Sequence, residues 1–436
     1  MPAEQRIRIL TPEQAAADIT TPASPIGTAL STRIAAAVAA TGAGEVYVPS
    51  PLAALRWRQI RTRVLAGDRQ GHIAWVGDSI PYGAASTGAT NPKHQKNYPG
   101  RVRSIINRTH GNAGTGFTLL DNDLFNNPAW DPRFVRSGLG WTAHTFGPYA
   151  LSCWRCDGGI DRYFEFTDVG TEFWFYTLAS GAPFQIQIDG AAPILMDGSK
   201  GGQVGSGVDA ELGYLNGAGS SINVNKIAMG ALGTHTLRII PATSDTNDLF
   251  LIAVEARVPT AGTFRVGNMS RNGAGTSTIV SSSDDANGTR GLPWIDSLRA
   301  DLLVMALNTN DWQGQSPLVN FKGRVATIVN RQRQVGVSAT GSTYAGGDAV
   351  LVLHPKPDVA TLGGGAYINP SWDQYRAAMY ELAEELDVCL IDFGDRWGGS
   401  YATANSRGLF ADAIHPGDAG ADDLAAGIVH ALFRAI

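Results

Sequence analysis

The sequence predicts an α/β fold in which a parallel sheet, covered by helices on both faces, is interrupted by an inserted antiparallel β-sandwich. Two observations support this fold class. Near both ends of the chain, apolar runs of buried-strand length alternate with helical stripes, as they do in parallel sheets. Between about residues 112 and 262, short aromatic or alternating strands are instead separated by glycine-containing turns, a pattern typical of antiparallel sandwiches.

Residues 1–48 differ in sequence pattern from the rest of the chain and are predicted to form an N-terminal attachment arm. Thr11-Pro12 predicts a helix start, and Leu30, Ile34 and Val38 form one apolar stripe on an alanine-rich helix. A stripe this narrow needs a partner surface. That surface is either the main domain or another molecule, and the sequence leaves both alternatives open.

The first part of the α/β domain is predicted over residues 49–111. Ser50-Pro51 predicts a serine-capped helix that runs to about Ala66. The apolar run 72–76 predicts a buried strand that leads into a turn at Gly77, and residues 98–106 predict the helix after it. This order of elements is the beginning of a parallel sheet.

The second part of the α/β domain is predicted over residues 263–436. Apolar runs at 264–266, 302–307, 349–353 and 388–391 predict its strands, and two apolar stripes predict helices between and after them: Tyr375, Met379, Leu382 and Leu386; then Leu424, Ile428 and Leu432. In the insertion, the aromatic run 173–176 is read either as core or as a sugar-stacking platform, and core is the commoner role of such a strand.

Bulk properties exclude several classes of protein. The length of 436 residues favours two or three domains, and a hydrophobic content of 44% fits a globular chain. The net charge of −5 provides no basic surface, so nucleic acid is not an expected partner. No run approaches the roughly 20 apolar residues of a membrane span, and residues 1–8 lack the apolar run of a signal peptide.

Cysteine usage predicts no metal site. Cys153 and Cys156 have CxxC spacing, but no second ligand pair follows, so a zinc site is not expected. The two residues are interpreted as ordinary thiols or as a local disulfide, and they do not settle the cellular compartment. No metal or cofactor is predicted.

Three segments far apart in the chain carry the residue types of one active site. Ser79 directly follows the strand predicted at 72–76, Asn310 follows the strand at 302–307, and Asp412 and His415 lie in a loop before the last helix. Ligands of parallel sheets bind at the carboxyl ends of strands. A serine nucleophile needs a base such as histidine, an aspartate to orient that base, and donors for the oxyanion. His354 is a rival base, but it lacks a partner aspartate at the short spacing of Asp412 and His415, so it is interpreted as a strand-end residue that lines the cleft.

These segments resemble the conserved blocks of the SGNH (GDSL-like) hydrolases. Gly77-Asp78-Ser79 resembles the first block, Asn268–Gly273 the second, Asn310-Asp311 the third and Asp412-x-x-His415-Pro416 the fifth. The resemblance covers about residues 70–110 and 263–436. It implies a flavodoxin-like three-layer α/β/α domain and hydrolysis of esters, often acetyl esters on carbohydrate.

The resemblance also implies a role for each site residue. Ser79 would be the nucleophile, His415 the base and Asp412 its orienter, while the Gly273 amide and the Asn310 side chain would bind the oxyanion. The chain departs from the family pattern at Asn308, where glycine is usual, and mildly at Ile80, where leucine is common. The change at Asn308 puts the catalytic rate, more than the chemistry, in question.

The N-terminal residues 21–27, followed by the alanine-rich helix, resemble leaders of minor tail proteins of phages of actinobacteria. Together with the site, this predicts an acetylesterase in a virion tail that acts outside the cell on cell-surface glycans. Its partners would be the acylated carbohydrate, other tail proteins contacted through the arm, and further copies in a homo-oligomer. Two alternatives stay open: an inactive receptor-binding or structural tail module, and a lipid esterase. The insertion resembles carbohydrate-binding-like sandwiches.

Overall fold

The structure is a computed structural model of the 436-residue chain. It describes residues 46–436 except for the following: 86–92, 138–139, 146–151, 158–161, 179–182, 197–214, 218–219, 242–247, 281–291, 293–294, 296–297, 299, 335, 338–342, 345 and 363–369. Residues 1–45 of the predicted N-terminal arm, with the helix start at Thr11 and the stripe from Leu30 to Val38, therefore lie outside the described residues, whereas its last residues, 46–48, are described.

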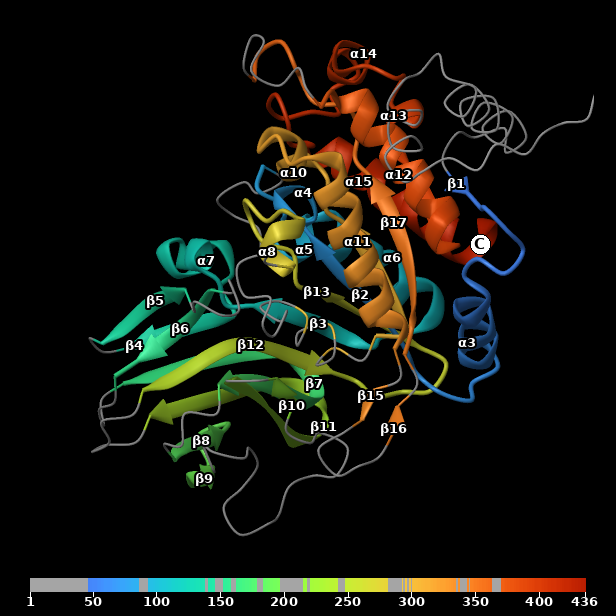
Figure 1. The fold of residues 1–436 in the computed structure, drawn as a ribbon. Helices are drawn as coiled ribbons and strands as arrows, with labels where there is room; N and C mark the ends of the chain where they lie inside the picture. The colour runs from blue at the N-terminus through green and yellow to red at the C-terminus, as the bar shows by residue number, and fades with distance from the viewer. Residues whose placement is uncertain are drawn as a thin grey trace, which may run out of the picture.

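A parallel sheet forms the centre of the upper part of the molecule in Figure 1. Its strands follow the order β18-β17-β14-β2-β13, and every neighbouring pair is parallel. The bounds are β2 Gly71–Gly77, β13 Phe264–Asn268, β14 Leu302–Ala306, β17 Asp348–Leu353 and β18 Cys389–Asp392. Each apolar run that predicted a strand in the α/β part is thus a strand of this sheet.

Helices cover both faces of the sheet because its strands are apolar on both sides. In β2, Ile73 and Trp75 pack in one core, whereas Ala74 and Val76 pack in the core of the opposite face. The first core includes α3 Leu55–Leu65, α6 Tyr98–His110 and α15 Asp418–His430. The opposite core includes α11 Leu318–Arg333 and α12 Trp372–Leu386. Alternating side chains on one buried strand therefore hold three layers together.

Short elements complete the α/β part. They are β1 Val46–Tyr47, α4 Ser79–Tyr82, α5 Lys93–Lys96, α8 Thr276–Ile279, α10 Thr309–Gln313, β15 Gly336–Val337, β16 Thr343–Tyr344, α13 Phe393–Arg396, α14 Tyr401–Ser406 and a π-helical turn at Ala431–Ala435. Strand β1 pairs antiparallel with β18 at the sheet edge.

The helix predicted from Ser50 begins later than the sequence suggested. The Ser50 hydroxyl accepts hydrogen bonds from the Leu52 and Ala53 amides, which closes a turn before the helix. Ala54 then adopts a left-handed conformation with φ of 56°, and α3 starts at Leu55. A serine hydroxyl can stabilise a turn as well as cap a helix, and here the Ser50 hydroxyl forms its hydrogen bonds within the turn.

The β-rich region continues the same sheet. Strand β3 Gly114–Leu119 lies between β13 and β12 Leu249–Arg257, parallel to the first and antiparallel to the second. Antiparallel strands extend the sheet from there: β4 Phe134–Ser137, β5 Trp141–Thr145, β6 Ser152–Cys156, β7 Tyr163–Leu178, β8 Phe184–Ile188, β9 Ile194–Met196, β10 Leu215–Gly217 and β11 Ser220–Pro241. Between β3 and β4 lie α7 Asn122–Asn126 and a 3₁₀ turn, Pro128–Trp130.

The long strands β7 and β11 fold back over themselves. The rings of Phe166 and Phe173 lie 5.1 Å apart, although seven residues of straight strand would separate them by roughly 23 Å. The pairing of β7 with β11 is irregular at the same level, between Ala228 and Gly233. The fold-back encloses a third core that is rich in aromatic residues. The predicted antiparallel strands are thus present, whereas an independent inserted β-sandwich domain, with boundaries at 112 and 262, stays a prediction.

The aromatic run in β7 belongs to the interior. Phe173, Phe175 and Tyr176 are buried, and Trp174 is half-buried with the Arg257 guanidinium 3.7 Å above its ring. These residues therefore belong to the hydrophobic core, and the three buried rings do not form an exposed surface on which a sugar could stack.

Cys153 and Cys156 are buried thiols on β6 and are not joined by a disulfide. Residues three apart on a strand point to opposite faces, and accordingly Cys153 packs in the core beneath the parallel sheet while Cys156 packs in the aromatic core. Burial raises the pKa of the Cys153 thiol to about 12. Of the two interpretations from sequence, buried thiols describe this pair and a local disulfide does not.

None of the described helices is long and apolar enough to cross a lipid bilayer.

A buried network around Arg133 ties the β-rich region to the α/β part. The guanidinium donates to Asp168 Oδ2 at 2.5 Å and to Asp131 Oδ2 at 2.6 Å. The ring of His94, from α5, lies 2.9 Å from the same Asp131 oxygen. Burial and the nearby Arg133 charge lower the pKa of His94 to about 4, so the folded state holds this ring neutral.

Acidification should therefore destabilise the protein through His94. The unfolded ring has a pKa near 6.5 and binds a proton that the folded ring excludes, so stability is full above that value and falls as pH drops towards 4. Between pH of about 7.5 and about 5, this residue contributes a loss of roughly 2 kcal/mol in the free energy of unfolding. Urea titrations of His94→Gln should show a shallower loss, with His430→Gln, an exposed histidine, as control. An equal slope in wild type and His94→Gln would refute the neutral ring.

Candidate active site

The nucleophile turn, Gly77 to Tyr82, connects the central strand β2 to the short helix α4. A Cβ on Gly77 would lie 2.2 Å from Pro81 Cγ and 2.8 Å from Ser270 Oγ, so only glycine fits where the strand ends. Asp78 caps α4, because its Oδ1 accepts a hydrogen bond from the Ile80 amide at 2.9 Å. The turn thus fixes Ser79 at the carboxyl end of β2.

The loop that carries Asp412 and His415 reaches Ser79 from the other end of the chain. His415 Nε2 lies 2.9 Å from Ser79 Oγ, and His415 Nδ1 lies 2.8 Å from Asp412 Oδ2. The loop is closed at its base, where the Ala411 amide donates to the His415 carbonyl at 2.8 Å. The structure therefore brings Ser79, His415 and Asp412 into one continuous chain of hydrogen bonds.

Asp412 is held in its charged form. Partial burial by itself would raise the pKa of this carboxyl, but hydrogen bonds from the His415 amide and ring and from the Ile414 amide outweigh it and lower the pKa. Its Oδ1 accepts both amides, at 2.6 and 2.7 Å, which leaves Oδ2 for the imidazole. An ionised carboxylate at Nδ1 holds the proton on that nitrogen and leaves Nε2 free to accept one from Ser79.

Three candidate oxyanion donors belong to segments that hydrogen-bond to one another: the amides of Ser79 and Gly273 and the side chain of Asn310. Gly273 is exposed, with φ of 74°, and nothing stands within 4 Å of where a Cβ would be. Within the described residues, the amides of Ser79 and Gly273 have no intramolecular acceptor. Asn310 Nδ2 donates to the Ala274 carbonyl at 2.9 Å, which leaves its second proton available. Donors of this kind are the groups that an oxyanion site requires.

The Gly273 loop is attached directly to the nucleophile turn. The Arg271 amide donates to the Gly77 carbonyl at 3.0 Å, and Asn268 Nδ2 donates to the Pro81 carbonyl at 2.9 Å. On the other side, buried Asp311 accepts hydrogen bonds from the amide and the hydroxyl of Thr276, at 2.7 and 2.6 Å. Asp311 is therefore a structural residue that fastens this loop to the Asn310 segment.

A buried polar cluster behind the turn was missed by the sequence reasoning. His354 was expected to line the cleft, but it is fully buried at the end of β17, with Nδ1 3.6 Å from Asp78 Oδ2 and 3.4 Å from Thr309 Oγ1. It is no rival base for Ser79, because it lies beneath the turn. Asn308 is also fully buried, and its amide atoms have no hydrogen-bond partner. No local sequence signal pairs Asp78 with a histidine 276 positions away.

Comparisons with known proteins identify a related family for part of the chain. Residues 243–422 match the model of the GDSL-like Lipase/Acylhydrolase family. This range contains Gly273, Asn310, Asp412 and His415, whereas Ser79 lies before it, separated by the β-rich region. No curated protein matches the sequence significantly.

Among solved structures, one titled "Peptidoglycan O-acetylesterase in action" has a TM-score of 0.61 and 15% identity, covering 89% of this chain and 99% of that one. At this identity, the match shows a common fold. A carbohydrate esterase of family two from Clostridium thermocellum, bound to cellohexaose, has a TM-score of 0.26 and 12% identity, covering 68% of this chain and 98% of that one. The structure titled TesA has a TM-score of 0.28 and 20% identity, with coverages of 40% and 80%.

The fold and the family match define the chain as a serine ester hydrolase. Its residues 243–422 form part of a GDSL-like hydrolase domain. The described residues contain no group of three or more histidine, cysteine, aspartate or glutamate side chains arranged to hold a metal ion.

The cap at Asp78 provides a test of the turn. Asp78→Ala removes the acceptor of the Ile80 amide, which should cost about 1 kcal/mol of stability. It should also lower kcat for p-nitrophenyl acetate about 10- to 100-fold, because Ser79 loses its fixed position. Asp78→Asn keeps an oxygen acceptor and is the matched control, which should retain most of the activity. If both variants lose activity equally, the carboxylate charge and not the cap is what Ser79 needs.

Proposed function

We propose that the chain is an esterase that removes O-acetyl groups from cell-surface glycans, with Ser79 as nucleophile. The observation that carries the proposal is the hydrogen-bond chain from Ser79 Oγ through the His415 ring to Asp412, at 2.9 and 2.8 Å. A serine in this arrangement can lose its proton to the imidazole as it attacks a carbonyl carbon.

The proposed reaction proceeds in two halves. Ser79 Oγ attacks the ester carbonyl while its proton passes to His415 Nε2, and the proton then leaves with the alcohol as the acyl-enzyme forms. Water attacks the acyl-enzyme with His415 as base, which releases the carboxylic acid and restores Ser79. Asp412 stabilises the imidazolium in both halves.

The developing oxyanion would be bound by three donors: the amides of Ser79 and Gly273 and the side chain of Asn310. Each is fixed before the substrate arrives, since the Gly273 loop is bonded to the nucleophile turn and the Asn310 amide to Ala274. Loss of one such donor costs about 2.7–4 kcal/mol of transition-state stabilisation in a model protease.

Two observations support a glycan ester as substrate. The fold similarity to a protein titled peptidoglycan O-acetylesterase extends over 99% of that chain. The His415 and Asp412 side chains are also partly exposed, at 20% and 51%, so the site lies near the surface, where a substituent of a polymer could approach it, although Ser79 itself is 4% exposed. Peptidoglycan or another acetylated envelope glycan is the substrate class that we propose.

The biological setting is a further part of the proposal. The resemblance of residues 21–27 to leaders of phage tail proteins supports a location in a virion tail, with the arm bound to other tail proteins or to further copies of the chain. This segment lies outside the described residues, so the support comes from the sequence alone.

A second candidate function is a binding module without catalysis. Asn308 favours it, because this residue replaces the usual glycine and buries an unpaired amide two residues before Asn310. A buried amide without partners costs free energy that an active loop would avoid.

Hydrolysis of p-nitrophenyl acetate by Ser79→Ala tests the proposed nucleophile. The substitution should lower kcat by roughly 10⁴-fold or more, because the acyl-enzyme cannot form. Ser277→Ala, an exposed serine on neighbouring α8, is the matched control and should keep wild-type activity. Acetate release from peptidoglycan, before and after mild alkaline removal of its O-acetyl groups, then identifies the substrate.

Full activity in Ser79→Ala would rule out this nucleophile. Absence of activity in the wild type on every acyl ester would favour the binding module.

A further inference from the structure

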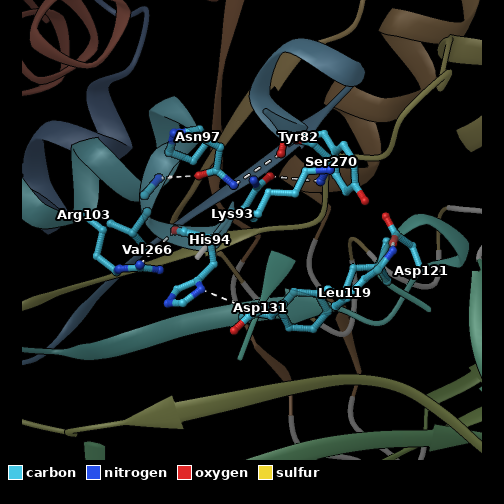
Figure 2. Close-up of a pocket in the computed structure, with 16 residues that line it drawn as sticks. Tyr82, Lys93, His94, Asn97, Arg103, Leu119, Asp121, Asp131, Val266 and Ser270 are labelled. Atoms are coloured by element: carbon cyan, nitrogen blue, oxygen red, sulfur yellow. Dashed lines mark hydrogen bonds and ion pairs between the residues drawn. The ribbon is translucent and has the colours of Figure 1, made fainter. Parts of the chain in front are cut away.

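A small cavity lies beside the nucleophile turn, where the α/β part meets the β-rich region (Figure 2). Its volume is about 50 Å³. Residues of α4, α5 and α6 line one side, and residues of β3, β13 and the segment around α7 line the other. Tyr82, three residues after Ser79, forms part of the wall, as does Ser270 of the Gly273 loop. The cavity thus adjoins two segments that build the candidate active site.

A buried ammonium group faces this cavity without a hydrogen-bond partner. Lys93 is 5% exposed, and its Nζ lies 3.3 Å from the centre of the Tyr82 ring and 4.0 Å from that of Trp130. The two rings form a cage that stabilises the charge but accepts no hydrogen bond. Burial lowers the pKa of Lys93 to about 8, so at neutral pH most molecules retain three N–H donors here.

A carboxylate oxygen faces the same cavity, beside the Tyr82 hydroxyl. Asp121 is 2% exposed and uses Oδ1 to cap α7, accepting from the Leu124 amide at 2.8 Å, while Oδ2 makes no hydrogen bond of normal geometry. Burial raises the pKa of Asp121, and the nearby Tyr82 hydroxyl opposes that rise. Within the described residues no ion pair joins Asp121 to Lys93, although the two attract each other. The Lys93 ammonium thus has no acceptor here. Asp121 Oδ2 and the hydroxyls of Tyr82 and Ser270 likewise lack hydrogen bonds of normal geometry in the same small space, which is costly unless a ligand or water occupies it.

The remaining wall contains apolar side chains. Phe117, Leu119, Leu124 and Val266 line the cavity together with the polar groups. A ligand that presents one hydrogen-bond acceptor, one donor and a small apolar group would match Lys93, Asp121 and this apolar part of the wall.

We propose that this cavity binds the acetamido group of an amino sugar, as a recognition subsite next to Ser79. The acetamido carbonyl would accept from Lys93 Nζ, its N–H would donate to Asp121 Oδ2, and its methyl group would contact the apolar wall. A carboxylate ligand is disfavoured by Asp121, and a hydroxyl group would leave the apolar wall unused. The inference rests on the proposed function, since it names the glycan whose esters the site would cleave.

The subsite is also connected to the oxyanion loop. Asn272 Nδ2, adjacent to Gly273, donates to Asp123 Oδ2 at 3.0 Å, and Asp123 belongs to the helix that Asp121 caps. A sugar held by Lys93 and Asp121 would therefore lie against the segment that carries the Gly273 amide, which places a neighbouring ester near Ser79.

Calorimetric binding to the full-length wild-type protein tests the subsite without any ester hydrolysis. The ligands are N,N′,N″-triacetylchitotriose and cellotriose, which share a β-1,4-linked glucose backbone and differ in the acetamido group at C2. The chitotriose derivative should bind about 10-fold more tightly or better, because only it pairs both buried groups. Equal binding of the two, or binding of neither at millimolar concentration, would overturn the proposal and leave water as the occupant.

Substitutions then test which residues cause the preference for triacetylchitotriose over cellotriose. Lys93→Met should abolish the preference for triacetylchitotriose, whereas Lys96→Met, on the same helix but outside the cavity, should keep it. Asp121→Asn, whose amide oxygen can still cap α7, should also lose most of the preference and serves if Lys93→Met does not fold. A preference that survives in both cavity variants would place sugar recognition elsewhere.

The two proposals fail separately. Loss of the binding preference with Ser79-dependent esterase activity intact would refute the subsite alone. Selective sugar binding without esterase activity would refute the proposed function and keep the subsite.

Discussion

The turn at Gly77 is the constraint on which the rest of the site depends. The central strand ends against Pro81, Ser270 and the Ala306 carbonyl, so tightly that no Cβ fits. The same close approach lets the Arg271 amide bond to the Gly77 carbonyl and holds the Gly273 loop beside Ser79. Parallel pairing aligns Gly77 with Ala306, which brings the Asn310 segment to the same edge of the sheet. One steric restriction thus positions groups from three distant parts of the chain.

The β-rich region is joined to the α/β part by a shared sheet and by buried charge. Strand β3 hydrogen-bonds to β13 on one side and β12 on the other, so the two regions have no clean boundary. At the junction, Arg133 pairs with Asp131 and Asp168. Buried charges are tolerated only when paired in this way. Lys93 and Asp121, a few residues from this network, lack such pairing, and this difference marks their cavity as a place for a ligand.

Regular elements of the α/β part could be predicted because each is a local pattern. The runs at 72–76, 302–307 and 349–353 are apolar on both faces, and the structure has them as buried parallel strands. The start of α3 could not be predicted, because the Ser50 hydroxyl can stabilise a turn as well as cap a helix. The left-handed conformation of Ala54 also leaves no signal in the sequence. The fold-back of β7 likewise depends on packing between Phe166 and Phe173, which strand periodicity does not encode.

The sequence by itself determined the residue types of the site and their order: Ser79, Gly273, Asn310, Asp412 and His415 stand in short motifs that were recognisable without coordinates. Tertiary structure alone decided what surrounds them. His354 lies beneath Asp78, Asn308 is buried without partners, and Lys93 faces Asp121 across a cavity. The physical reason is the separation along the chain between the residues that interact. A motif consists of residues that are neighbours in sequence, whereas burial and unpaired hydrogen-bonding groups arise from contacts between segments hundreds of residues apart.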